Sequence, residues 1–364
     1  MPLPRSWVEV SLGAIRANYQ AIRELVGVRA EIMPVVKADA YRHGAVEVSR
    51  ALEIEGAPWL AVSHIEEGAA LRDAGIQTRI LVMADFPGET DALRGYRLTP
   101  VVHSLSDIPK TKVPYHLKID TGMGRLGTTA APEEIVRAVA AGAAPLEGVM
   151  THFASAANYS SSQTSDQIAR FQTVVDTLCA AGRKPRYIHS SATIPVAYGR
   201  LEAWGNLVRP GHAIYGYVSP VRGAAPPSAL RVKPALTWKA AVLAVKDVPA
   251  GALIGYGGMH RAEGPMRLAV LAAGYADGLP HRLSNKGAVI AQGKLVPIVG
   301  AVSMDLTTID ATACPELRPG DSVLLLGSEG SVSIDAQQIA RLAGTISYSV
   351  LCGISARVQR VYVD

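Results

Sequence analysis

The stretch WLAVSHIEEGAALRDAGIQTRILVMA (59–84) contains one complete unit of a pattern that runs through the first half of the chain. It begins with an apolar run, WLAVS (59–63). It continues with IEEGAALRDAG (65–75), whose apolar residues recur at helical spacing, and it ends with a second apolar run, RILVMA (79–84). Continuous aliphatic strands that alternate with helices are typical of parallel sheets covered by helices. This stretch therefore predicts a strand, a helix and a parallel strand.

Similar apolar runs recur from about residue 30 to residue 211. The runs are IMPVVK (32–37), WLAVS (59–63), RILVMA (79–84), TPVVH (99–103), YHLKID (115–120), LEGVMTHF (146–153), YIHSS (187–191) and NLVRPG (206–211). Further helical patterns lie at PEEIVRAVAAG (132–142) and QIARFQTVVDTLCAAG (167–182). Eight strand repeats over roughly 200 residues favour a closed (β/α)8 TIM-type barrel over an open doubly wound sheet.

The pattern changes at SPVRGAAPPSA (219–229), whose proline, glycine and serine content is typical of a linker. Strand-like runs separated by turns follow. Helical patterns are scarce among these runs, and the clearest of them is IDAQQIARLAG (334–344). The opening segment SWVEVSL (6–12) also has strand character. We expect residues 10–222 to form the barrel, and residues 1–9 with 223–364 to form a mainly β domain.

Composition narrows the class of protein. The chain has 364 residues, a formal net charge of +5 and three cysteines without paired or metal-like spacing. No basic run predicts a nucleic-acid partner, and no apolar stretch is long enough to predict a membrane span. We therefore expect a cytoplasmic, soluble and unprocessed protein with reduced thiols, no metal and a small-molecule ligand.

Lys37 is the first residue whose position suggests chemistry. It ends the first barrel strand, and catalytic groups of such barrels lie at the carboxyl ends of the strands. The apolar residues before it would favour the neutral amine, which is the form that attacks carbonyl carbon. A lysine at a strand end is more often part of an ion pair with a carboxylate, so position alone does not decide for a catalytic role.

Longer motifs surround Lys37 and recur in both halves of the chain. They are VVKADAYRHG (35–44), HLKIDTGMGRLG (116–127), THF (151–153), HSSAT (189–193), VRPGHAIYG (208–216), IGYGG (254–258), GYADG (274–278), SMD (303–305) and ISYS (346–349). In residues and in order, these motifs resemble those of the alanine racemase family. The resemblance runs from about residue 5 to the end of the chain, and it includes the reactive lysine.

The resemblance implies a pyridoxal 5′-phosphate (PLP) enzyme and a role for each matching residue. Lys37 would bind PLP covalently, and Arg125 would face the substrate carboxylate and the PLP phenolic oxygen. The other cofactor-binding residues would be Tyr41, His152, Ser191, Arg209, Gly211, His212 and Tyr348. Tyr275 and Met304 would line the substrate site, and Lys118 matches a lysine that is often carboxylated on its Nζ atom in this family.

Arg209 matches the arginine that faces the PLP pyridine nitrogen. A guanidinium does not readily give up a proton, so the ring nitrogen would stay unprotonated and would be a weaker electron sink. This would limit side reactions such as transamination. His152 would link Arg209 to the catalytic tyrosine, although a strand-end histidine can also be purely structural.

Two bases on opposite faces of Cα would carry out the racemisation. Lys37 would serve the D face and Tyr256 the L face. A tyrosine is a weak base at its ordinary pKa of about 10, so cationic neighbours would have to stabilise its phenolate. In the family the tyrosine comes from the partner subunit, which implies a head-to-tail homodimer that interconverts L- and D-alanine. Its product would serve either D-alanine biosynthesis for the cell wall or catabolism.

Several residues depart from the family pattern. Arg42 replaces a glycine, Ser190 an asparagine and Ser349 an acidic residue, whereas His212 replaces an aliphatic residue and is best interpreted as a packing substitution. The family often has an aspartate and two arginines in an outer gate, and their counterparts here are Ala157, His281 and Ala301. We therefore also consider a racemase that accepts larger amino acids such as serine.

Three other classes of protein remain as alternatives. A non-catalytic PLP-binding protein would have a lone barrel, and the β domain with Tyr256 argues against it. A fold-related decarboxylase would place a carboxylate where this chain has Arg209. An inactive relative would lack proton exchange at Cα, which only an assay can detect.

Overall fold

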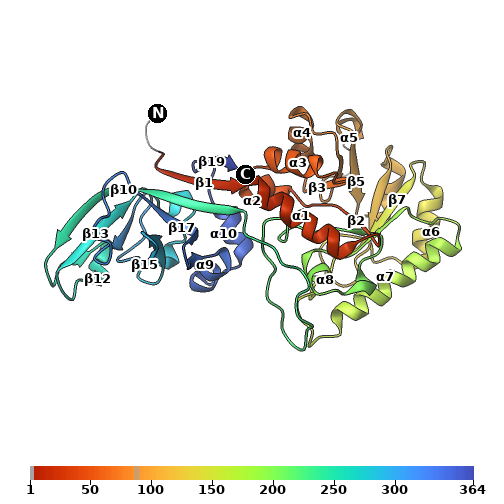
Figure 1. Ribbon diagram of the computed structural model, residues 1–364. Coiled ribbons are helices and arrows are strands. Elements are labelled where there is room, and N and C mark those ends of the chain that lie inside the picture. The colour runs from red at the N-terminus through yellow and green to blue at the C-terminus, as the bar shows by residue number, and fades with distance from the viewer. Residues whose placement is uncertain (1–3, 87, 89) are drawn as a thin grey trace. The chain divides into compact units, whose positions relative to one another are not determined.

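The structure is a computed structural model that describes residues 4–86, 88 and 90–364, so residues 1–3 of the predicted segment 1–9 lie outside the described residues. The chain divides into two compact units (Figure 1). The barrel unit comprises residues 14–40 and 45–233. The β unit comprises residues 1–13, 41–44 and 234–364, and each unit is considered by itself below.

The barrel unit contains a closed ring of parallel strands. Its strands are β2 (Glu31–Ile32), β3 (Trp59–Val62), β4 (Arg79–Val82), β5 (Leu98–Val102), β6 (Tyr115–Lys118), β7 (Leu146–Met150), β8 (Tyr187–His189) and β9 (Leu207–Val208). Strands β3 to β8 pair in sequence order, and β2 pairs with β9. A parallel bridge from Val35 to Ala61 joins β2 to β3, and the Arg209 amide donates to the Ser191 carbonyl at 2.8 Å next to β8. The predicted eight-stranded barrel is therefore confirmed.

Helices cover the outside of this ring, and α7 lies along it in Figure 1. They are α1 (Leu12–Val26), α3 (Ala45–Ile54), α4 (Ile65–Asp73), α5 (Thr90–Gly95), α6 (Pro132–Ala141), α7 (Gln163–Ala180) and α8 (Thr193–Ala197), with the short 3-10 helices η1 (Leu105–Lys110) and η2 (Leu201–Ala203). The helices predicted at 65–75, 132–142 and 167–182 are confirmed as α4, α6 and α7. Their apolar faces pack on the strands, as Phe171 and Leu178 do against Val149, and this burial fixes the strand ends that carry the site.

The β unit is organised around one long strand, β10 (Leu236–Val248). Its other strands are β1 (Ser6–Ser11), β11 (Leu253–Ile254), β12 (His260–Arg261), β13 (Met266–Leu271), β14 (Ala288–Ala291), β15 (Lys294–Pro297), β16 (Thr307–Asp310), β17 (Ser322–Glu329), β18 (Val332–Ile334) and β19 (Gln359–Val363). The main sheet has the order β15-β14-β17-β10-β1-β19. Strand β1 is antiparallel to β10 and parallel to β19, so the opening segment belongs to this sheet.

Short helices complete the β unit. They are the 3-10 helices η3 (Tyr256–Gly258), η4 (Tyr275–Asp277) and η5 (His281–Leu283), with α9 (Ala336–Ala343) and α10 (Ser347–Gly353). The predicted helix at 334–344 is confirmed as α9. Asp335 caps it by accepting from the Gln338 amide at 2.7 Å, and Gly344 ends it with a φ of 65°.

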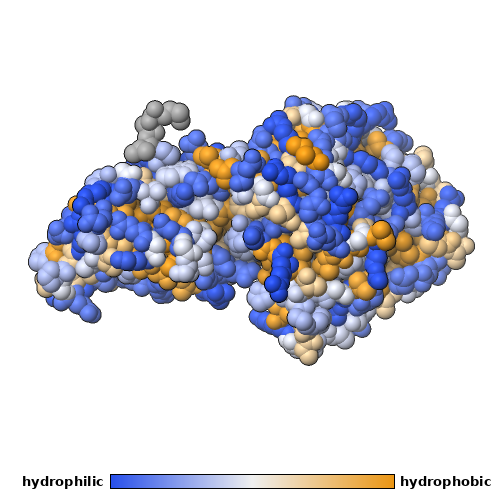
Figure 2. Space-filling view, viewed as in Figure 1, coloured by the Kyte–Doolittle hydropathy of each residue, from blue (hydrophilic) through white to orange (hydrophobic). Residues whose placement is uncertain are grey.

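On the face shown in Figure 2, hydrophilic and hydrophobic surfaces are interspersed within each unit. Among the described residues, no helix combines the length and the apolar character that crossing a membrane requires.

Candidate active site

Basic side chains and histidines gather at the carboxyl ends of the barrel strands. Lys118 is the last residue of β6, Arg209 directly follows β9, and His152 lies two residues after β7. Lys118 is 6% exposed and Arg209 is 2% exposed. Because parallel strands of a barrel end on the same face, the fold brings these residues together from distant parts of the sequence. Lys37, which follows the bridge at Val35, is half-buried on this face.

The backbone directly after Lys37 is left-handed. The short helix α2 (Lys37–Arg42) contains five successive non-glycine residues, Ala38 to Arg42, with φ between 52° and 66°. Such a conformation costs about 1–2 kcal/mol per residue, so surrounding contacts must hold it. The Ala38 amide donates to Glu67 at 2.7 Å, and the Asp39 carboxylate accepts from the Ala45 amide at 2.8 Å. Backbone strain of this kind is concentrated at functional sites, which supports a special role for Lys37.

Hydrogen bonds fix the guanidinium of Arg209 in the barrel interior. It donates to the Thr151 carbonyl at 2.8 Å, to the Ser190 carbonyl at 3.2 Å and to Nδ1 of His189 at 2.8 Å. A longer contact of 3.5 Å joins it to Nδ1 of His152. Burial lowers the pKa of Arg209 to about 9, so the guanidinium remains a cation at neutral pH. The arginine is therefore a fixed, charged donor at the centre of the site.

The cations of this cluster raise the local electrostatic potential. Burial, and then the charges of Arg125 and Arg209, lower the pKa of Lys118 to about 8. Burial and the same two arginines, with Lys118, lower the pKa of His152 to about 3. In both shifts burial is the largest cause, and the positive charges of the neighbouring arginines and lysines add to it.

The loop that carries Arg125 is shaped by the carboxylate of Asp120. This carboxylate accepts from the amides of Gly122, Met123 and Gly124 at 2.8 to 3.2 Å. Burial alone would raise the pKa of Asp120, but these backbone donors lower it below its ordinary value. The carboxylate is thus engaged by the backbone, and Arg125 is exposed on the resulting loop.

Thr193 holds backbone amides of the loop after β9 at the same face. The amides of Gly211 and Ala213 donate to Oγ1 of Thr193 at 3.3 and 3.2 Å. Ser191 is fully buried, and its hydroxyl donates to the Ala203 carbonyl at 2.6 Å. His212 is 1% exposed and stacks on Tyr217 with ring centroids 5.0 Å apart, as expected of a packing residue.

These residues fit PLP by the chemistry of their donors. Lys37 offers an amine, Arg209 is a buried guanidinium, and amides and hydroxyls line the end of β9. The excess of positive charge suits a phosphate and a substrate carboxylate, which an anionic cofactor and an amino acid would bring together. A cationic or apolar ligand would leave the same groups uncompensated.

The β unit carries a second group of predicted site residues on adjoining loops. The amides of Tyr275 and Ala276 donate to the carbonyls of Ser303 and Met304 at 2.9 and 3.0 Å. Arg357 joins the same two loops through Asp277 at 2.8 Å and Asp305 at 2.7 Å.

Tyr256 lies on another loop of this unit, beside Gly255. A Cβ atom at Gly255 would lie 3.0 Å from the Ala301 amide nitrogen, so the two loops pass close to each other. The side chains of Tyr256, Tyr275 and Met304 are 78%, 46% and 54% exposed. These three predicted residues are therefore available to a ligand or to another chain.

Two predicted phosphate ligands also meet within the β unit. The rings of Tyr41 and Tyr348 lie 6.0 Å apart at an angle of 45°. Burial, and then Tyr348, raise the pKa of Tyr41, so its hydroxyl keeps its proton and is able to donate to an anion. The Arg42 carbonyl accepts from Nε of Arg360 in β19 at 3.2 Å, which holds this segment against the sheet.

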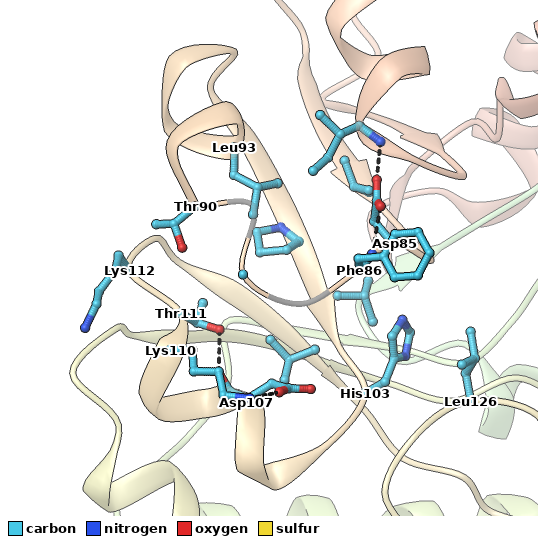
Figure 3. A pocket seen from close by; sticks show the side chains of 16 residues that line it. Asp85, Phe86, Thr90, Leu93, His103, Asp107, Lys110, Thr111, Lys112 and Leu126 are labelled. Carbon is cyan, nitrogen blue, oxygen red and sulfur yellow. Dashed lines mark hydrogen bonds and ion pairs between the residues drawn. The ribbon is translucent and has the colours of Figure 1, made fainter.

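A cavity of about 200 Å³ opens beside the ends of β4 and β5. Figure 3 shows His103 at its edge, pointing toward Phe86, while the Asp85 carboxylate accepts from the amides of Ile65 and Phe86. Burial, and then the charge of Lys118, lower the pKa of His103 to about 4. The cavity thus adjoins the cationic cluster at the same barrel face.

Three polar residues of this site were not predicted from the sequence. Thr151, His189 and Thr193 hold the guanidinium or the amides described above. His189 and Thr193 stand within the HSSAT motif, and Thr151 precedes the singled-out His152. Their types were visible in the sequence, but their partners lie on other strands.

Family models match both parts of the chain. The model described as "Alanine racemase, N-terminal domain" matches residues 10–220, and the one described as "Alanine racemase, C-terminal domain" matches residues 235–362. The chain belongs to the alanine racemase family.

Individual alanine racemases are similar over nearly the whole length. The alanine racemase of Carboxydothermus hydrogenoformans is 42% identical, with 98% of this chain and 99% of that protein covered. The crystal structure of the alanine racemase of Streptomyces lavendulae matches with a TM-score of 0.91 and 32% identity, covering 100% of this chain and 98% of that one. The alanine racemase of Bartonella henselae, whose structure contains covalently bound pyridoxal phosphate, matches with a TM-score of 0.85 and 28% identity over the full length of both chains.

Proposed function

We propose that this chain is a cytoplasmic, PLP-dependent racemase that interconverts L- and D-alanine. The observation that carries the proposal is the position of Lys37 at the carboxyl end of the barrel, next to a strained backbone segment and at the same face as the buried cations Lys118 and Arg209. Residues 10–222 would supply most of the groups that hold the cofactor. The β region, 1–9 and 223–364, would supply Tyr348 and the catalytic Tyr256.

Lys37 would hold PLP, and Arg209 would face its pyridine nitrogen. The amides at Gly211 and His212, with Ser191, Tyr41 and Tyr348, would bind its phosphate. When bound, PLP supplies an electron sink that stabilises negative charge at the substrate Cα. Arg209, which does not readily give up its proton, would keep this sink weak enough to favour return of the proton to Cα.

Two side chains would then move protons at Cα. Lys37 would become a free amine when the substrate amine takes its place on the cofactor. From L to D, Tyr256 as phenolate would then take the α-proton from one face, and Lys37 as ammonium would donate a proton to the other. From D to L the same two groups would act in reverse. One proton leaves Cα and one returns, so the reaction changes only the configuration. Arg125 would orient the substrate carboxylate, and a carboxylated Lys118 would in turn orient Arg125.

We propose that Tyr256 acts in a second copy of this chain, within a head-to-tail homodimer. The exposure of Tyr256, Tyr275 and Met304 supports this arrangement, because reactive side chains need a covered surface to exclude water. Measurement of the molecular mass of the purified enzyme in solution at several concentrations tests the proposed dimer. A monomer with full activity would contradict the shared site.

Replacement of Lys37 tests the central proposal. Lys37→Ala should remove both the visible absorbance of lysine-bound PLP and the interconversion of D- and L-alanine. Lys184→Ala, at an exposed lysine of the barrel unit, is the matched control and should retain both. Racemisation by the Lys37→Ala enzyme at the wild-type rate would refute the assignment.

A broader substrate range is the second candidate. The counterparts of the family's gate residues are Ala157, His281 and Ala301, which are smaller or less charged than an aspartate and two arginines. Turnover of alanine, serine and larger amino acids by the wild type should show measurable use of serine. Ala157→Asp with His281→Arg should reduce the rate for serine more than that for alanine, whereas strict use of alanine by the wild type would exclude this candidate.

A further inference from the structure

The donors around Arg209 dictate how the neighbouring histidines are protonated. Arginine has only donors, so Nδ1 of His189, which lies 2.8 Å from the guanidinium, must act as an acceptor. Burial, and then the charge of Arg209, hold the pKa of His189 well below its ordinary value. The neutral ring therefore carries its single proton on Nε2.

The ring of His116 is fixed in the same way. Nε2 of His189 lies 2.7 Å from Nδ1 of His116 and must donate to it. Burial, followed by Arg79 and Arg209, lowers the pKa of His116 to about 3, so this ring is also neutral. Its proton must then be on Nε2. Both rings are fully buried, and their two tautomers follow from Arg209 alone.

A carboxylate lies at the far end of this chain of hydrogen bonds. Nε2 of His116 lies 3.9 Å from Oε2 of Glu147, which is too long for a hydrogen bond and leaves a charge–dipole contact, and this buried nitrogen has no hydrogen-bond partner among the described residues. Nη2 of Arg79 holds both oxygens of Glu147 at 2.7 and 2.8 Å, and its guanidinium lies 3.8 Å above the ring of Trp59.

The chain runs through the barrel from one end to the other. Arg79 is the first residue of β4 and Glu147 the second of β7, whereas His189 and Arg209 are at the carboxyl ends of β8 and β9. Gly148 leaves room for the His116 ring of this chain, because a Cβ atom at position 148 would lie 2.6 Å from Nδ1 of His116. The end of a barrel opposite its active site normally serves stability.

We propose that Glu147 is a positioning residue for the active site, which acts on Arg209 through the directed chain His116–His189. The carboxylate attracts the Nε2 proton of His116, and this polarises both imidazoles so that Nδ1 of His189 becomes a stronger acceptor. The guanidinium is then held in one orientation with its charge retained. The inference rests on the proposed role of Arg209 beside the cofactor.

Nitrogen-15 NMR of the histidine side chains tests the chain itself. Spectra of the protein with and without PLP, assigned with single histidine variants, should show His116 and His189 neutral and protonated on Nε2 at pH 7. A proton on Nδ1 of either ring, or a charged ring at that pH, would overturn the proposal. This measurement does not depend on racemase activity.

Kinetics and absorbance of the holoenzyme test the effect of Glu147. Glu147→Gln should lower kcat about threefold to tenfold, with little change in KM, and should alter the absorption spectrum of bound PLP. Glu55→Gln removes a comparably shielded carboxylate that pairs with Arg16. This control should change neither kcat nor the absorption spectrum of bound PLP. A Glu147→Gln enzyme with wild-type kcat and spectrum would refute the inference.

A double variant shows whether Glu147 acts through His116. His116→Phe keeps an aromatic ring against Tyr187 and interrupts the chain, so it should lower kcat at least as much as Glu147→Gln. Adding Glu147→Gln to His116→Phe should have no further effect, because the path is already broken. If Glu147→Gln lowered kcat by the same factor in the His116→Phe enzyme as in the wild type, the proposed route through His116 would be wrong. If the wild type bound PLP but did not racemise alanine, the proposed function would fail instead.

Discussion

Arg209 in the barrel unit is 2% exposed and is held by carbonyls and imidazole nitrogens, whereas Tyr256 in the β unit is 78% exposed. The two residues belong to one proposed reaction but to opposite environments. A buried charge must be supported by its surroundings, so its replacement affects both folding and chemistry. An exposed tyrosine has few contacts to lose, so its replacement affects chemistry alone. The difference indicates which variants separate activity from stability.

The largest effect is expected at Arg209. Arg209→Met should abolish racemisation and lower the free energy of unfolding by roughly 3 kcal/mol, because the buried acceptors of Thr151, Ser190 and His189 lose their donor. Chemical denaturation and a racemase assay measure both effects. Arg125→Met, at an exposed loop position, is the control for stability and should lower activity while leaving the free energy of unfolding nearly unchanged.

A large effect confined to activity is expected at Tyr256. Tyr256→Phe should lower the racemisation rate by roughly 10² to 10⁴, the usual contribution of a general base, without changing the thermal midpoint. In D2O this variant should still exchange the α-proton of D-alanine through Lys37 and should lose exchange of L-alanine. Equal loss for both enantiomers would contradict the assignment of one face to each base.

An effect of intermediate size is expected on the free energy of unfolding when the pH is lowered. Unfolded histidines titrate near pH 6.5, but folded His116 binds a proton only near pH 3, and the folded-state pKa of His189 is also well below 6.5. Between these values the unfolded chain binds more protons, so stability is lost as pH falls from about 6.5. Each such histidine should contribute about 1.4 kcal/mol per pH unit within this window.

Urea denaturation at pH 7, 6 and 5 measures this slope. In His116→Phe the slope should be smaller by the contribution of one histidine. An unchanged slope in that variant would show that His116 titrates alike in the folded and unfolded states.

The smallest effect is expected at Arg357, which joins the loops of Tyr275 and Met304 at the protein surface. Arg357→Ala should raise KM for alanine about twofold to fivefold, as expected from loss of an exposed ion pair, with a smaller change in kcat. Arg318→Ala, which removes another surface ion pair of the β unit with Glu316, should leave KM unchanged. A wild-type KM in Arg357→Ala would mean that the hydrogen bonds between the two loops are enough to hold them in place.

Much of the fold could be predicted because its signals are local. The barrel strands lie in short runs that are rich in apolar residues, and the helices α4, α6 and α7 have apolar residues at helical spacing. The left-handed segment from Ala38 to Arg42 could not be predicted this way. Its residues do not favour positive φ, and contacts such as that of Asp39 with the Ala45 amide hold it.

The sequence by itself determined the barrel, the β region and the motifs with Lys37, Arg125, Arg209 and Tyr256. Only the tertiary structure decided that positive charges gather around Lys118 and that His116 and His189 lie in line between Glu147 and Arg209. The reason is physical. Strand and helix patterns depend on neighbours along the chain, whereas pKa values and tautomers depend on burial and on partners that the fold brings from other strands.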